Sequence, residues 1–155
     1  MGMGEPFLNY KNVLNAAKFL NHKMGFGARR ITISTAGIVP KIRKIAEEGH
    51  QFKLAISLNA VTEVERKKIM SLTNTYSLNE LIDSAKYYYQ KTRRLITFEY
   101  VLLKGLNDSK EDAIRLADIL KGIKCKVNII PFNEIEGYYK RPEKEQINNF
   151  SQILN

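Results

Sequence analysis

Residues 95–103 read LITFEYVLL. This run is rich in β-branched and aromatic residues and is almost wholly apolar, which is typical of a strand covered on both faces in a parallel sheet. Alternation along a strand places Thr97 and Glu99 on one face and Phe98 and Tyr100 on the other. A lone carboxylate at Glu99 is either a functional group facing inward or the partner of an arginine or lysine, and we favour the ion pair.

Similar runs precede and follow this one, at Ile31–Thr35, Lys53–Leu58 and Lys126–Ile130. Hydrophobic spacing and capping residues predict helices around them, at Tyr10–Lys23, Ile38–Glu48, Leu78–Lys91, Ala113–Leu120 and Pro142–Leu154. An alternation of strands and helices implies crossover connections between parallel strands. The fold class is therefore α/β, with a parallel sheet or barrel.

Two of the predicted helices have recognisable starts. Ser77 followed by Glu80 forms a capping box, and Asp108 followed by Glu111 has the same spacing. Gly122 is placed to end the helix that Asp108 begins. These signals set the expected helix boundaries.

The composition describes one soluble domain of 155 residues, with 44% hydrophobic and 26% charged residues. The net charge is +9, of which residues 1–100 carry +8, and this excess favours a polyanionic partner. Cys125, the single cysteine, excludes an internal disulfide framework and an iron–sulfur site built only from this chain's thiolates. No apolar stretch approaches the roughly 20 residues that cross a bilayer, and no signal peptide is recognisable, so we expect no membrane partner and a cytoplasmic location.

Small polar groups gather where the predicted strands end, which is where parallel α/β proteins bind ligands. They follow the four strands in order: Ser34, Thr35 and Gly37; Ser57, Leu58 and Asn59; Lys104 and Gly105; Pro131, Phe132 and Asn133. Capping of the next helix explains each position taken singly. Their agreement on one rim instead predicts a site for a small polar ligand.

Glu5 joins this rim if a strand precedes Met1. A carboxylate that follows Gly2 and Gly4 can accept hydrogen bonds from an ammonium group. The alternative is a glutamate at a helix start, stabilised by the helix dipole.

Other sequence features give weaker evidence for a functional site. Gly25–Gly27 lacks a preceding strand, and His22 and His50 lack metal-ligand spacing. Cys125 has no histidine near it in sequence and is interpreted as an ordinary thiol. The aromatic residues among basic ones at Tyr87–Tyr89 and Tyr138–Arg141 could stack on unpaired bases, but this interpretation is not the favoured one.

Five motifs occur in one order: GMGEP (2–6), RRITISTAGIVP (29–40), LAISL (54–58), TFEYVLLKGLND (97–108) and CKVNIIPFN (125–133). Together they resemble the radical S-adenosylmethionine (SAM) adenine methyltransferases of the RlmN and Cfr family, over essentially the whole chain. The resemblance implies a partial (β/α) barrel with SAM and a [4Fe–4S] cluster at its mouth. It also implies a SAM site formed by Gly4, Glu5, Ser34, Ser57, Leu58, Asn59 and Asn133. The family usually has histidine where this chain has Asn59, which can donate and accept but cannot titrate.

Other family elements are absent from the sequence. The cluster motif CxxxCxxC lies upstream of the glycine loop in the family, and the methyl-carrying cysteine lies near the C-terminus, beyond the last residue here. We therefore expect residues 1–155 to be the central part of a single radical SAM core domain. This piece supplies no catalytic residue and no metal ligand, and is inactive when isolated.

The resemblance implies an enzyme that, at full length, methylates C2 of an adenine in large-subunit ribosomal RNA, and of some transfer RNAs. Three alternatives remain open at this point. They are a non-catalytic RNA- or nucleotide-binding remnant, an adenine-C8 methyltransferase of the same family, and an unrelated phosphate-binding barrel enzyme. The last would need a phosphate loop at a helix N-terminus, and no convincing one is present.

Overall fold

The computed structural model describes residues 4–134 and 137–154. Their strands form one four-stranded sheet in the order β1 (Thr32–Thr35), β2 (Lys53–Ser57), β3 (Ile96–Leu102) and β4 (Cys125–Pro131). All three pairings are parallel, and each strand lies beside the next one in the chain. The predicted α/β class with a parallel sheet is confirmed.

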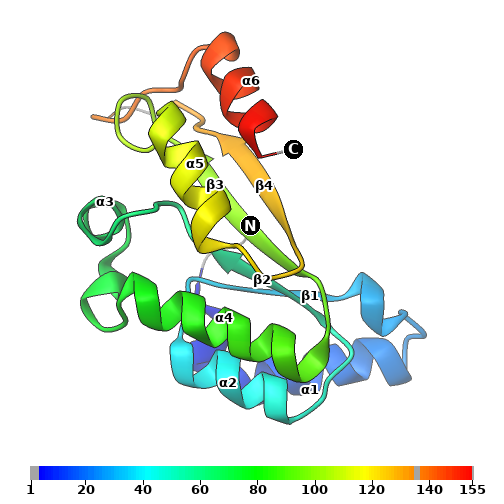
Figure 1. Ribbon diagram of the computed structural model, residues 1–155. Coiled ribbons are helices and arrows are strands. Elements are labelled where there is room, and N and C mark those ends of the chain that lie inside the picture. Colours follow the sequence, from blue (N-terminus) through cyan, green and yellow to red (C-terminus); the bar gives the residue numbers. More distant parts are fainter. Residues whose placement is uncertain (1–3, 135–136, 155) are drawn as a thin grey trace.

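The helices are α1 (Tyr10–His22), α2 (Val39–Glu47), α3 (Glu63–Ile69), α4 (Leu78–Thr92), α5 (Lys110–Ile119) and α6 (Lys144–Ile153). Short 3-10 turns lie at η1 (Pro6–Asn9), η2 (Ala28–Arg30) and η3 (Ser71–Asn74). In Figure 1, α2 and α4 lie side by side below the sheet, while α5 and α6 lie near β4. Sequence analysis did not predict α3, which lies near the carboxyl ends of β1 and β2 (Figure 1). In the described part of the chain no helix is both long and apolar enough to cross a membrane.

The sheet has one face buried under helices and one face that is largely polar. Phe98 and Tyr100 of β3 are fully buried, whereas Thr97 and Glu99, which alternate with them, are only partly covered. The predicted division of this strand between two faces is therefore confirmed. Because burying an aromatic side chain removes 150–250 Å² from water, as a rough range, the helix-covered face supplies the core and leaves the other face available for function.

The two predicted capping boxes have different outcomes. The Ser77 hydroxyl accepts from the Glu80 amide at 3.2 Å and the Glu80 carboxylate accepts from the Ser77 amide at 2.8 Å, so this box is confirmed. The box predicted at Asp108 is wrong, because the helix begins one residue later, with Ser109 as its N-cap and Asp112 as the reciprocal partner. Asp108 instead accepts from the amide of Gly105 at 2.8 Å, which closes the turn before the helix.

Candidate functional site

A carboxylate held by two hydroxyl groups lies on the polar face of the sheet. One oxygen of Glu99, Oε2, is 3.2 Å from the Ser34 hydroxyl and 3.4 Å from the Ser57 hydroxyl. Ser57 and Glu99 are register partners on adjacent strands, so strand pairing brings these side chains together. The predicted ion pair is wrong: no Lys, Arg or His of the described residues lies within salt-bridge distance of Glu99. Hydroxyl donors bring no positive charge to the carboxylate, in contrast to a lysine or arginine partner.

Glu5 brings a second carboxylate to the end of β1. Its Oε1 accepts from the Phe7 amide at 3.0 Å and from the Thr35 hydroxyl at 2.7 Å, and its Oε2 accepts from the Ala36 amide at 2.6 Å. It is the N-cap of η1, so the helix-start interpretation is confirmed, and the same bonds fix the carboxylate at the rim. Gly4 is exposed with φ +101°, a left-handed conformation that favours glycine.

Asn59 connects the ends of β2 and β3. Its side-chain oxygen accepts from the Val101 amide at 3.0 Å, and its carbonyl oxygen accepts from the Asn107 side chain at 2.7 Å. The φ of Asn59 is +60°, a left-handed conformation that asparagine tolerates better than most residues. Asn107 is fully buried, and its amide group also donates to the Val101 carbonyl at 2.8 Å. Asn59 thus shapes the rim through its backbone as well as through its side chain.

The structure does not bring all predicted site residues together. Leu58 is fully buried, its amide donates to the Glu99 carbonyl at 2.9 Å, and its own carbonyl accepts from Arg66. It therefore presents no unused backbone group to a ligand. Asn133 is exposed beyond the end of β4, and no hydrogen bond among the described residues joins it to the rest of the rim. Gly2 and Met3 of the glycine motif lie outside the described residues.

Arg66 on α3 donates hydrogen bonds to backbone carbonyl oxygens at the rim, and the sequence did not predict this role. Its side chain is 1% exposed and donates to the carbonyl oxygens of Ala36 at 2.8 Å and Leu58 at 3.1 Å, and to the Thr73 hydroxyl at 2.9 Å. Burial lowers the pKa of its guanidinium to about 10, so it stays protonated at neutral pH. Because Ala36 also donates to Glu5, one buried cation connects the ends of β1 and β2 with the N-terminal carboxylate.

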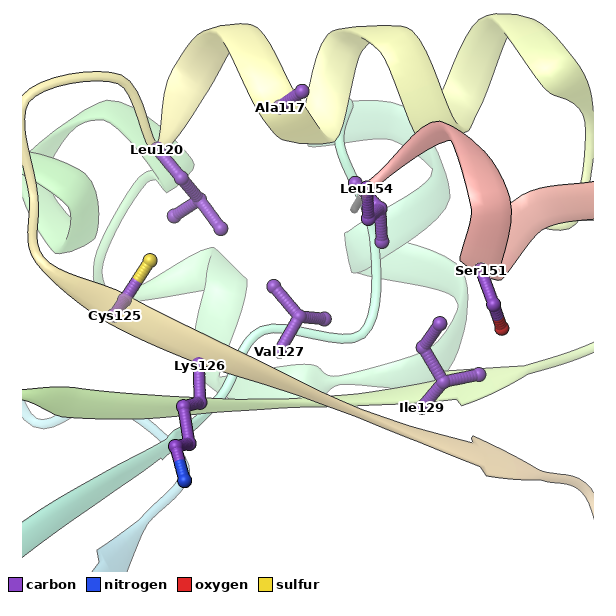
Figure 2. Close-up of a pocket in the computed structure, with 8 residues that line it drawn as sticks. All are labelled: Ala117, Leu120, Cys125, Lys126, Val127, Ile129, Ser151 and Leu154. Atoms are coloured by element: carbon purple, nitrogen blue, oxygen red, sulfur yellow. The ribbon is translucent and has the colours of Figure 1, made fainter.

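A pocket of about 630 Å³ lies elsewhere, between β4, α5 and α6. Figure 2 shows the side chains of Leu120, Cys125, Val127 and Leu154 turned into it from β4 and the helices. Burial raises the pKa of the Cys125 thiol, which agrees with its interpretation as an ordinary thiol. Among the described residues, no group of three His, Cys, Asp or Glu could hold a metal ion.

Comparisons with known proteins agree with this architecture. The profile of the radical SAM superfamily matches residues 1–117. A protein of Clostridium botulinum (strain Alaska E43 / Type E3) named "Probable dual-specificity RNA methyltransferase RlmN" is 49% identical over 99% of this chain and 45% of its own length. A protein of the same name from Thermotoga petrophila is 48% identical over 99% of this chain and 46% of its own length. The chain thus spans about half the length of these curated relatives.

Two solved structures share the fold. A radical SAM methyltransferase from Sphaerobacter thermophilus superposes with a TM-score of 0.95 at 46% identity, over 99% of this chain and 46% of that one. A domain of a pyruvate-formate lyase-activating enzyme from Bacteroides vulgatus superposes with a TM-score of 0.76 at 14% identity, over 99% of this chain and 90% of that one. The second similarity concerns the fold alone. Both agree with the predicted partial barrel, which is therefore confirmed.

The radical SAM family implies SAM and a [4Fe–4S] cluster as cofactors. The rim of carboxylates and hydroxyls has the donor and acceptor groups that a cationic amino acid derivative such as SAM requires. The cluster fits differently, because several cysteine thiolates are needed to hold it and the one cysteine of this sequence, Cys125, lies in the pocket of Figure 2. This chain's residues therefore do not supply a cluster site. The profile match across most of the chain, with the sheet and rim described above, shows that the chain belongs to the radical SAM superfamily.

Proposed function

We propose that this chain is the SAM-binding central part of an RNA methyltransferase that acts on C2 of an adenine in large-subunit ribosomal RNA, and of some transfer RNAs. In this proposal residues 1–155 belong to a single core domain of a longer protein, and the RNA substrate places that protein in the cytoplasm. The names of relatives that are 48–49% identical over 99% of the chain support the RNA methyltransferase activity.

The observation that carries the proposal is the pair of carboxylates at the rim. SAM bears a positive ammonium group and a positive sulfonium group, and the rim offers Glu5 and Glu99, neither in an ion pair with another described residue. Ser34 and Ser57 donate to Glu99 but also carry lone pairs that can accept from a ligand. A rim of this kind can recognise a small zwitterionic cofactor through charge and hydrogen bonds.

In its reaction, SAM supplies a methyl group and radical chemistry. The residues of this chain bind and orient it: Glu5 receives the ammonium group, while Ser57 at the end of β2 and Glu99 in the middle of β3 bind other polar atoms of SAM. Arg66 holds the backbone beneath them in place. Fixed positions matter because a displacement of about 1 Å at a reacting centre can cost about 100-fold in rate.

Nucleoside mass spectrometry of ribosomal RNA tests the proposed activity. The complete reading frame that contains this chain is deleted in its host and then restored, either unchanged or with Glu99→Gln. We expect 2-methyladenosine at the target position to disappear on deletion, to return with the unchanged gene, and not to return with the variant. Recovery of 8-methyladenosine would favour the C8 alternative, and no change on deletion would favour a non-catalytic remnant.

A further inference from the structure

A second polar site lies next to the rim, toward the amino ends of the strands. It is a pocket of about 540 Å³ at the amino ends of the strands. The cationic side chains that line it are Arg29, Lys53, Arg93, Arg94 and Lys126. None of the described residues that line it is acidic, and none of these five cations forms an ion pair with another described residue.

Strand pairing accounts for this concentration of charge. Thr32 of β1 is the register partner of Lys53 of β2, and Thr97 of β3 is the register partner of Lys126 of β4. Alternation puts all four on the polar face, because their neighbours Ile33, Leu54, Ile96 and Phe98 are buried in the core. In Figure 2 the Lys126 side chain leaves β4 on the side opposite to Cys125 and Val127. Two lysines and two threonines therefore lie on the polar face of the sheet, near the amino ends of the strands.

The arginines complete the pocket from the loops before β1 and β3. Arg94 donates to the carbonyl and the side-chain oxygen of Gln51, which fixes the direction of its guanidinium. The guanidinium of Arg93 lies 5.8 Å from the ring centre of Tyr89. Planar guanidinium groups match the geometry of phosphate oxygens, and lysines act as additional point charges.

We infer that this pocket binds the phosphate groups of an RNA strand whose target base lies at the rim. Lys53 and Lys126 are exposed, so they can reach phosphates of a strand that passes over the surface. Thr97 at the pocket and Glu99 at the rim are two residues apart on β3, which corresponds to about 7 Å. Phosphates that flank the base are therefore within reach. The inference rests on the RNA partner of the proposed function, but it concerns residues outside the SAM rim.

The test compares two double variants with the same loss of charge. Lys53→Ala/Lys126→Ala removes the pocket lysines, and Lys11→Ala/Lys18→Ala removes two exposed lysines of α1 as the matched control. Fluorescence anisotropy measures binding of a labelled single-stranded RNA across a salt series. Inorganic tripolyphosphate serves as a second ligand, and SAM binding is measured on every variant.

We expect the pocket variant to bind RNA roughly tenfold more weakly at low salt. Its slope of log K against log salt should be smaller by about 1.4, since each phosphate contact with a single strand contributes about 0.7. The α1 control should remain close to the unchanged protein, and neither variant should alter SAM binding. If the unchanged protein does not bind SAM, this result counts against the proposed function. The comparison of RNA binding between the two variants remains valid.

Three results would overturn the inference. Equal weakening by both variants would mean that net charge alone attracts RNA. Unchanged RNA binding by the pocket variant would show that the lysines do not contact the strand. Loss of tripolyphosphate binding with full retention of RNA binding would assign the pocket to a compact phosphate compound instead.

Discussion

The Ser34 hydroxyl donates to Oε2 of Glu99 at 3.2 Å, although 65 residues separate the two in sequence. The bond crosses β2 and connects β1 with β3 on the polar face of the sheet. It fixes the direction of the Glu99 side chain on the polar face of the sheet. This arrangement is what makes the carboxyl end of the sheet suitable for a cationic ligand.

Glu99→Gln tests whether that charge is used. The substitution keeps the size of the side chain and removes its negative charge, so we expect SAM to bind roughly ten- to hundredfold more weakly, the effect of one hydrogen bond to a charged group. Isothermal titration calorimetry measures the affinity. Asp83→Asn, an exposed charge change on α4, is the control and should bind SAM normally. Equal affinities in the Glu99 variant and the unchanged protein would show that this carboxylate does not contact the ligand.

Arg66→Met tests the buried cation behind the rim. The variant leaves the carbonyl oxygens of Ala36 and Leu58 and the Thr73 hydroxyl without their donor, and we expect a loss of about 3–5 kcal/mol in the free energy of unfolding. Urea denaturation followed by circular dichroism measures it. Lys68→Met, on an exposed position of the same helix, should cost less than about 0.5 kcal/mol. A similar small cost for both variants would argue against the role given to Arg66.

Asn59 allows a test of left-handed backbone strain. Asn59→Gly and Asn59→Ala both remove the bond to the Val101 amide, but glycine accepts a φ of +60° without strain whereas alanine does not. We expect the alanine variant to be less stable than the glycine variant by about 1 kcal/mol. Thermal unfolding of both variants in the same buffer checks the order. Greater stability of the alanine variant would contradict the conformation assigned to this residue.

Acid stability should depend on Glu48. Burial raises the pKa of this carboxyl, but the hydrogen bonds from Tyr10 and His50 and the nearby charges of His50 and Lys44 outweigh it, so the net shift is downward. Between the folded-state and unfolded-state pKa values of Glu48, the folded protein therefore binds fewer protons than the unfolded chain. Its stability falls as the pH drops through the folded-state pKa. Tyr10→Phe removes one of these bonds, at 2.8 Å, and should flatten the pH dependence of stability below pH 4.5, the ordinary pKa of a glutamate. Urea unfolding at a series of acidic pH values measures this. An unchanged slope in the variant would exclude the Tyr10 bond as a cause.

The strands and most helix boundaries could be predicted because their signals are local. Residues 95–103 alternate as a strand does. Ser77 and Glu80, which cap α4, are only three residues apart in the sequence. The environment of Glu99 could not be predicted, because its hydroxyl partners are 42 and 65 residues away and only the sheet register brings them close.

Arg66 was missed for a related reason. The segment around it, Glu63–Ile69, reads EVERKKI, which is typical of a solvent-exposed helix. Nothing in this pattern distinguishes the one side chain that is buried from its charged neighbours. Its partners are backbone carbonyl oxygens at the ends of β1 and β2, and a backbone acceptor leaves no mark in the sequence.

Titration of the ¹⁵N-labelled chain with SAM, followed by amide chemical shifts, tests the central claim most directly. The account predicts saturable shifts that cluster at Glu5, Ser34 and Ser57, with little change around Lys53 or in the pocket beneath α5. Shifts confined to those other regions, or no saturable shifts in the folded chain, would contradict a SAM site at the carboxyl end of this sheet.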